Sequence, residues 1–145
     1  LMGASAAARA SRTYDNVILR VLGASRRQLL ALQLAEYGLL TSVLAVVAAP
    51  LVEEMVFRGL VLRGLLSRFR PGGAIAIQAV VFGAAHIDPV RGMGNIGLVM
   101  VLSGVGAALG VFEHLLRRIG PTIIAHAMIN AVAMAIALSG WSPKR

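Results

Sequence analysis

The chain has 145 residues, of which 58% are hydrophobic and only 14% are charged, and its net charge is +8. Because soluble domains carry about 25% charged residues, this composition excludes an ordinary soluble domain and favours a membrane protein. The basic residues are spread between apolar runs with few aromatic residues, which argues against nucleic acid as a partner. The absence of cysteine excludes a disulfide framework and a cysteine nucleophile.

The first 28 residues are polar to amphipathic and contain five arginines against a single acid, Asp15. A basic flank of this kind marks the cytoplasmic side of a first membrane span. We therefore expect an integral membrane protein, surrounded by the lipid bilayer and with its N-terminus on the cytoplasmic side.

Apolar runs follow the basic flank at 29–49, 51–66, 74–87, 96–112 and 121–138. They predict an all-α fold, a polytopic membrane helical bundle of about five segments. A single helix over 29–66 would measure about 57 Å, nearly twice the hydrocarbon thickness, so we expect a break near Pro50. Five alternating segments then place the basic loops around Arg68 and Arg117 on the cytoplasmic side.

The stretch APLVEEMVFRG, residues 49–59, carries three charges in apolar surroundings. An ionisable residue at mid-membrane costs at least about 2.5 kcal/mol, so such residues usually face a partner or a cavity. Glu54 and Arg58 are four residues apart and can pair on one helix face, whereas Glu53 is turned about 100° away. Alternatively, the two acids cap a helix that begins after Pro50.

Two further polar patterns lie in apolar segments, Phe82-x-x-x-His86 and His126-x-x-x-Asn130. Taken alone, His86 reads as an interfacial residue, the His126 pair as a helix-to-helix hydrogen bond, and His114 as a solvated loop residue. Together with the glutamates, however, these residues come from three segments and can converge only inside the bundle. There they supply a general base and oxyanion donors.

Glu53 suits the general base better than Glu54, because Arg58 stabilises the charged form of Glu54 and weakens it as a base. A rival mechanism is zinc-dependent hydrolysis, with His86, His126 and a glutamate as ligands and an open position for water. The sequence lacks the HExxH pattern of many zinc peptidases. We expect no cofactor, with zinc as the alternative.

The ordered motifs EExxFRG, FxxxH and HxxxN resemble the CAAX prenyl protease type II family, also called the CPBP or Abi family, over about residues 43–138. The resemblance implies an all-helical intramembrane endopeptidase that acts without a metal. The implied general base is Glu53, with Glu54 and His86 as its supports. The implied oxyanion donors are His126 and Asn130. The implied structural supports are Phe57, Arg58 and Phe82.

The resemblance also bears on partners. It implies a peptide or protein substrate in or at the membrane, and eukaryotic members cleave prenylated CAAX proteins. Bacterial members are tied to bacteriocin processing and immunity, and for this chain we expect the bacterial cytoplasmic membrane. A non-catalytic membrane immunity or interaction protein is therefore an alternative function.

Residues 9–42 contain LGASRRQ and resemble the end of an FtsX-like ABC-transporter permease domain. This resemblance implies an ABC ATPase as a partner through the N-terminal segment around Arg26, and makes a permease fragment a further alternative. We accordingly expect a basic permease-like segment at 1–42, a protease core at 43–138 and a polar tail at 139–145.

Overall fold

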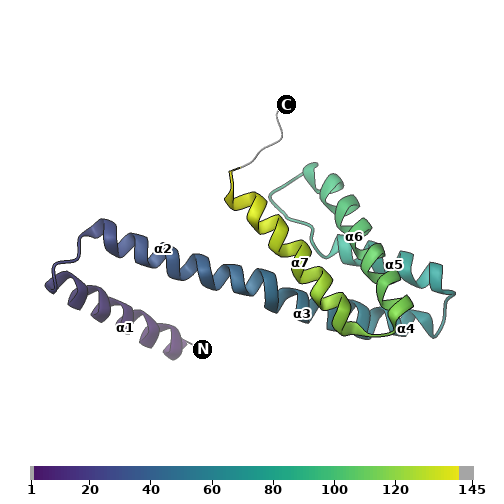
Figure 1. The fold of residues 1–145 in the computed structure, drawn as a ribbon, viewed down its shortest axis with the longest axis horizontal. Coiled ribbons are helices and arrows are strands. Elements are labelled where there is room, and N and C mark those ends of the chain that lie inside the picture. Colours follow the sequence, from purple (N-terminus) through teal and green to yellow (C-terminus); the bar gives the residue numbers. More distant parts are fainter. Residues whose placement is uncertain (1, 141–145) are drawn as a thin grey trace. The chain divides into compact units, whose positions relative to one another are not determined.

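The structure describes the backbone of residues 2–140 and the side chains of residues 10, 11 and 13–140. Helices make up almost all of this part of the chain (Figure 1). The computed structural model contains, in order, α1 (Met2–Val21), α2 (Arg26–Val43), the π-helical stretch η1 (Leu44–Ala48), α3 (Ala49–Glu54), the π-helical stretch η2 (Met55–Leu62), α4 (Arg63–Leu66), α5 (Pro71–Ala84), α6 (Gly94–Leu116) and α7 (Ile119–Leu138). No strand occurs within residues 2–140. The predicted all-α fold is confirmed, while most of the predicted polar tail lies outside the described residues.

Within the described range, three helices are long and apolar enough to cross a membrane: Arg26–Leu66, Gly94–Leu116 and Ile119–Leu138. The apolar helix α5 is shorter than these. Many leucine, isoleucine and valine side chains on the long helices are exposed, as expected where lipid rather than protein covers a helix. The arrangement fits the predicted membrane bundle.

No turn interrupts the helix between Arg26 and Leu66, so the helix does not end near Pro50. The break expected there is a change in hydrogen bonding within a continuous helix. Over η1 the bonds shift from the α to the π pattern, and the Ala49 N–H donates to the Leu44 carbonyl five residues back. This shift accommodates a proline, which lacks an N–H, inside a helix. Because the helix does not begin at Pro50, the two glutamates that follow are not helix caps.

Contacts divide the chain into two compact units, residues 1–42 and 43–145. In the first unit, Gly23 adopts φ 98° in the turn after α1, a conformation that favours glycine. Ser25 and Gln28 then form a reciprocal cap at the start of α2. The Ser25 N–H donates to Gln28 Oε1 at 2.8 Å, and the Gln28 N–H donates to Ser25 Oγ at 3.3 Å.

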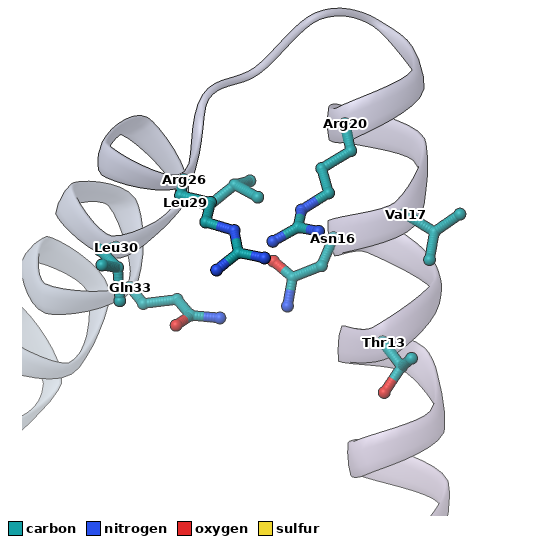
Figure 2. A pocket seen from close by; sticks show the side chains of 8 residues that line it. All are labelled: Thr13, Asn16, Val17, Arg20, Arg26, Leu29, Leu30 and Gln33. Atoms are coloured by element: carbon teal, nitrogen blue, oxygen red, sulfur yellow. The ribbon is translucent and has the colours of Figure 1, made fainter.

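A cavity of about 460 Å³ lies between α1 and the start of α2, and Figure 2 shows polar side chains directed into it. It is lined by Thr13, Asn16, Val17, Arg20, Arg26, Leu29, Leu30 and Gln33. All of these residues belong to the first unit. The ATPase partner inferred for this segment stays a prediction.

The most extensive packing in the second unit joins α5 and α6, where glycines let the two helices approach closely. A Cβ atom at Gly106 would lie 3.2 Å from the Ala79 Cα, and one at Gly110 would lie 2.9 Å from Gln78 Oε1. Gly104 faces open space instead. This contact fixes the helix that precedes His86 against α6.

Gly83 is the tightest point of this contact. A Cβ atom there would overlap the Ser103 side chain and come 2.6 Å from the Val99 carbonyl oxygen, which belongs to the backbone and cannot rotate away. We expect Gly83→Ala to lower the free energy of unfolding by about 1–3 kcal/mol through overpacking. Thermal unfolding in detergent measures this, with Gly104→Ala as the control that keeps or slightly raises Tm. Equal Tm values for the two variants would contradict the packing.

Candidate active site

The predicted catalytic residues all lie in the second unit, and they come from three parts of the chain: Glu53 and Glu54 from α3, His86 from the turn after α5, and His126 and Asn130 from α7. Four of the five line a common cavity of about 290 Å³. It is lined by Ala45, Ala49, Glu53, Phe82, His86, Leu102, Val105, His126, Ile129 and Asn130. Glu54 does not line it, since this side chain is fully buried behind His126.

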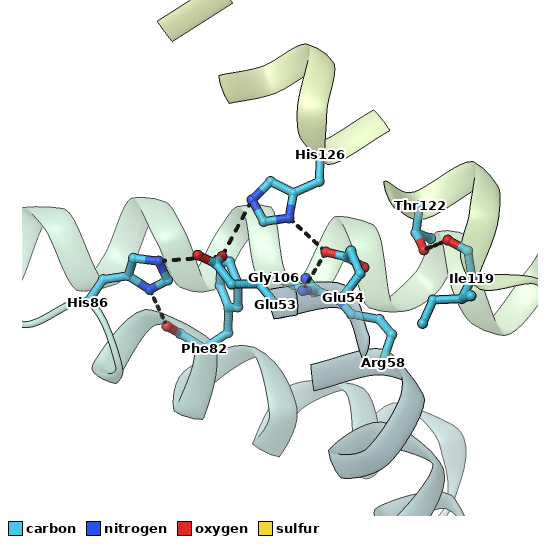
Figure 3. A network of polar contacts seen from close by, with 9 residues as sticks. All are labelled: Glu53, Glu54, Arg58, Phe82, His86, Gly106, Ile119, Thr122 and His126. Carbon is cyan, nitrogen blue, oxygen red and sulfur yellow. Dashed lines mark hydrogen bonds and ion pairs between the residues drawn. The ribbon is translucent and has the colours of Figure 1, made fainter. Parts of the chain in front are cut away.

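Glu54 forms the buried anchor of the site. Its Oε1 atom lies 2.8 Å from Arg58 Nη1, which confirms the expected pairing on one helix face, and both side chains are fully buried. The same oxygen accepts a hydrogen bond from His126 Nδ1 at 2.8 Å (Figure 3). The glutamate thus ties α3 to α7 and is shared between a guanidinium and an imidazole.

Arg58 has two further contacts, one with the expected support Phe82 and one with a backbone carbonyl that no sequence pattern indicates. Its Nη2 donates to the Gly106 carbonyl at 3.3 Å, and its guanidinium carbon lies 4.6 Å from the centre of the Phe82 ring. The Phe57 ring meets the Phe82 ring edge-on at 5.0 Å. These contacts compensate part of the cost of burying the guanidinium. Phe57 and Phe82 therefore lie where structural supports of the site are expected.

Glu53 is the exposed carboxylate of the pair, and it faces two histidines. Its Oε2 atom lies 3.7 Å from Nε2 of His86 and 3.7 Å from Nε2 of His126 (Figure 3). The Glu53 side chain is 26% exposed, whereas that of Glu54 is 0% exposed. The geometry therefore separates a carboxylate that can meet a substrate from one that cannot.

His86 is oriented by the end of α5. The backbone N–H groups of the three residues after this helix donate to the carbonyls of Val81, Gly83 and Ala84. None of these three bonds uses the Phe82 carbonyl. His86 Nδ1 lies 2.7 Å from the Phe82 carbonyl oxygen. Since a carbonyl can only accept, Nδ1 carries the hydrogen, and Nε2 is turned towards Glu53.

His126 is oriented in the same manner by Glu54. The carboxylate accepts from Nδ1, so Nε2 points towards Glu53 and the cavity. The ring is buried and lies edge-on to Phe82, with 5.8 Å between the ring centres. Both histidines thus present the same nitrogen to the same glutamate oxygen.

Asn130 lies one helical turn after His126 and lines the same cavity, as its spacing indicated. Its Nδ2 atom donates to the Ala45 carbonyl in η1 at 2.9 Å. No sequence pattern predicts this partner, because a backbone carbonyl carries no residue-type signal.

A second buried acid, Glu113 in α6, lies outside this site and pairs with Arg63 at 3.3 Å. Neighbouring His114 is half-buried in the last turn of α6, since this helix continues to Leu116. The expectation of a solvated loop histidine is therefore wrong. The run FEHLL continues the helix because it contains neither glycine nor proline.

No group of three or more histidine, aspartate or glutamate side chains within the described residues is spaced to hold a metal ion. His86 and His126 each commit Nδ1 to a protein oxygen, and only their Nε2 atoms face Glu53. Because a histidine that ligates a metal through Nε2 also bonds Nδ1 to a protein oxygen, this orientation does not separate the two mechanisms, and the zinc alternative stays a prediction.

Comparison with known families matches residues 35–132 to the family described as type II CAAX prenyl endopeptidase Rce1-like. The matched range covers more than half of the chain and includes all five predicted catalytic residues. No curated protein and no solved structure matches the chain. With its apolar helices, the family match indicates an integral membrane protein. The chain therefore belongs to the Rce1-like family of type II CAAX prenyl endopeptidases, a family of membrane proteases.

Proposed function

We propose that the chain is an intramembrane endopeptidase in which Glu53 acts as the general base on a water molecule. The observation that carries this proposal is the position of Glu53 Oε2 at a cavity, 3.7 Å from Nε2 of both His86 and His126. A partly exposed carboxylate flanked by two oriented imidazoles is the kind of constellation that hydrolyses a carbonyl compound.

The spacing between Glu53 and His86 supports a bound water. In the proposed arrangement the His86 ring carries one hydrogen, on Nδ1, and offers a lone pair at Nε2, so Nε2 and the Glu53 carboxylate are both acceptors. Two acceptors 3.7 Å apart do not bond directly, but one water can donate to both. Glu53 would take a proton from this water as the water oxygen attacks the substrate carbonyl, and His86 would hold the water in place. As the tetrahedral intermediate collapses, Glu53 would give this proton to the leaving amine nitrogen, so that the C–N bond breaks and a carboxylic acid and an amine are released.

His126 and Asn130 would stabilise the oxyanion that forms on the substrate carbonyl. To donate from Nε2 while Nδ1 donates to Glu54, His126 must be an imidazolium, with Glu54 as its counter-ion. The Asn130 carboxamide nitrogen carries two hydrogens, and the Ala45 carbonyl uses one. The other is left for the oxyanion.

Glu54 and Arg58 would position the catalytic side chains. Neither side chain is exposed, so neither reaches a substrate directly. Glu54 instead would fix the ring of His126, and Arg58 would hold Glu54 in place through the 2.8 Å ion pair. The proposed substrate is a peptide or protein segment at the membrane, with a prenylated CAAX-type peptide as the first one to test.

Asn130→Ala tests the oxyanion assignment. Loss of one preorganised donor is expected to lower kcat for peptide cleavage by about 10²–10³-fold, because that donor acts mainly in the transition state. Rates of peptide cleavage by the purified protein give kcat and KM for each variant. Met128→Ala, at a 64% exposed side chain on the same helix, is the matched control and should retain wild-type rates. Unchanged kcat in Asn130→Ala would exclude the donor role.

A non-catalytic immunity or interaction role makes the opposite prediction for these residues. Its phenotype would survive substitution of Glu53 and His126 wherever the variants fold, since no chemistry is required of them. The same set of variants therefore separates the two functions.

A further inference from the structure

The carbonyl of Ala45, in the wall of the candidate site, has lost its helical hydrogen-bond donor. In an α-helix this oxygen would accept from the N–H of residue 49, but the Ala49 N–H donates to Leu44 instead. In a π-helix it would accept from the N–H of residue 50, but Pro50 has none. Both possible backbone partners are therefore removed, one by the π register and one by the proline.

Asn130 supplies the missing donor from another helix. Its Nδ2 atom lies 2.9 Å from the Ala45 carbonyl oxygen, although the two residues are 85 positions apart in the chain. The surroundings are partly buried, so an unpaired carbonyl there would be costly. Pro50 is itself buried, and α7 packs against both η1 and α3.

This hydrogen bond also fixes which way the carboxamide faces. A carbonyl can only accept, so the nitrogen of Asn130, and not its oxygen, must lie against Ala45. One N–H is used there, and the other N–H is presented on a side chain that lines the cavity with Glu53 and His126. A carboxamide without this partner could turn its oxygen to the cavity and repel an oxyanion.

We propose that Pro50 is a positioning residue for Asn130: by leaving the Ala45 carbonyl without a backbone donor, it creates the acceptor that orients the carboxamide as a donor towards the cavity. The inference deepens the proposed function and rests on it for the consequence in catalysis. The structural part, that Pro50 controls the orientation of Asn130, is independent of any activity.

Side-chain amide NMR tests the structural part directly. The chain has three asparagines, Asn16, Asn95 and Asn130, so selective ¹⁵N-asparagine labelling gives three carboxamide signals to resolve. In Pro50→Ala, residue 50 regains an N–H, and either helical register then returns a backbone donor to the Ala45 carbonyl. We expect the Asn130 signal to shift and its hydrogens to exchange faster with water.

Pro121→Ala is the matched control, because Pro121 lies near the start of α7, where the N–H of a helical residue has no intrahelical partner anyway. It should leave the Asn130 signal in place, and circular dichroism should show equal helix content in both variants. An Asn130 signal unchanged by Pro50→Ala in a folded protein would overturn the proposal.

Kinetics test the consequence. Misplacing a donor is expected to lower kcat of Pro50→Ala by roughly 10- to 100-fold with a smaller change in KM. In an Asn130→Ala background the same substitution should have no further effect on kcat, since the residue through which Pro50 acts is gone. Independent, multiplicative losses would contradict positioning through Asn130. If the wild-type protein cleaves no peptide, the proposed function fails, while the NMR result still decides whether Pro50 orients Asn130.

Discussion

Glu53→Gln is expected to lower kcat for peptide cleavage by about 10²–10⁴-fold, the range that a positioned general base contributes. The carboxamide keeps the shape of the side chain but cannot take a proton from water. Because the Glu53 side chain is 26% exposed and lies 3.7 Å from Nε2 of both histidines, beyond direct hydrogen-bond distance, its replacement should leave the fold intact. Cleavage rates and thermal unfolding of the same preparation separate these two effects.

Glu36→Gln is the control for this prediction. Glu36 is exposed, lies in α2 and belongs to the first unit, so its charge has no part in the proposed chemistry. The control should cleave at the wild-type rate. Full activity in a correctly folded Glu53→Gln would remove the base assignment.

Arg58→Met is expected to produce the largest loss of stability, about 3–5 kcal/mol in the free energy of unfolding. The substitution leaves the fully buried carboxylate of Glu54 without its guanidinium partner, at 2.8 Å in the wild type. It also removes the donor to Gly106 and the contact with the Phe82 ring. Reversible unfolding in mixed detergent measures the loss.

Arg63→Met is the matched control, since it removes an arginine from an ion pair in the same helical stretch. The Arg63 side chain is 57% exposed, so solvent screens this pair more than the fully buried Arg58 pair, and the loss of stability should be smaller even though Glu113 is buried. Adding Glu54→Leu to Arg58→Met should recover part of the stability, because a buried pair can often be replaced by apolar side chains. Equal losses for Arg58→Met and Arg63→Met would show that the buried pair does not anchor the site.

Much of the second unit follows from apolar runs and polar spacing in the sequence. The runs at 96–112 and 121–138 became α6 and α7 with small changes at their ends. The four-residue spacing of Glu54 and Arg58 predicted their ion pair, because residues four apart in a helix share one face whatever the sequence. Such local relations need no knowledge of tertiary packing.

Features set by the backbone were not predictable in the same way. Proline statistics favour a helix end near Pro50. The helix instead continues past Pro50, because the π-helical stretch η1 changes the hydrogen-bonding pattern just before it. The partners of Asn130 and Arg58 are the carbonyls of Ala45 and Gly106, which any residue type would supply. Sequence patterns report side-chain chemistry, so they indicate which residues are polar and buried but not which backbone groups satisfy them.

In the proposed function, Glu53 activates water to hydrolyse a peptide bond at this cavity. The most direct measurement is incubation of the purified, liposome-reconstituted chain with a prenylated CAAX-type peptide in H₂¹⁸O, with mass spectrometry of the products. We predict that the wild-type protein releases a C-terminal fragment, that the new carboxylate of the upstream fragment contains one ¹⁸O atom, and that Glu53→Gln yields neither product at a comparable rate. An intact peptide with folded wild-type protein, or equal ¹⁸O-labelled cleavage by Glu53→Gln, would contradict the claim.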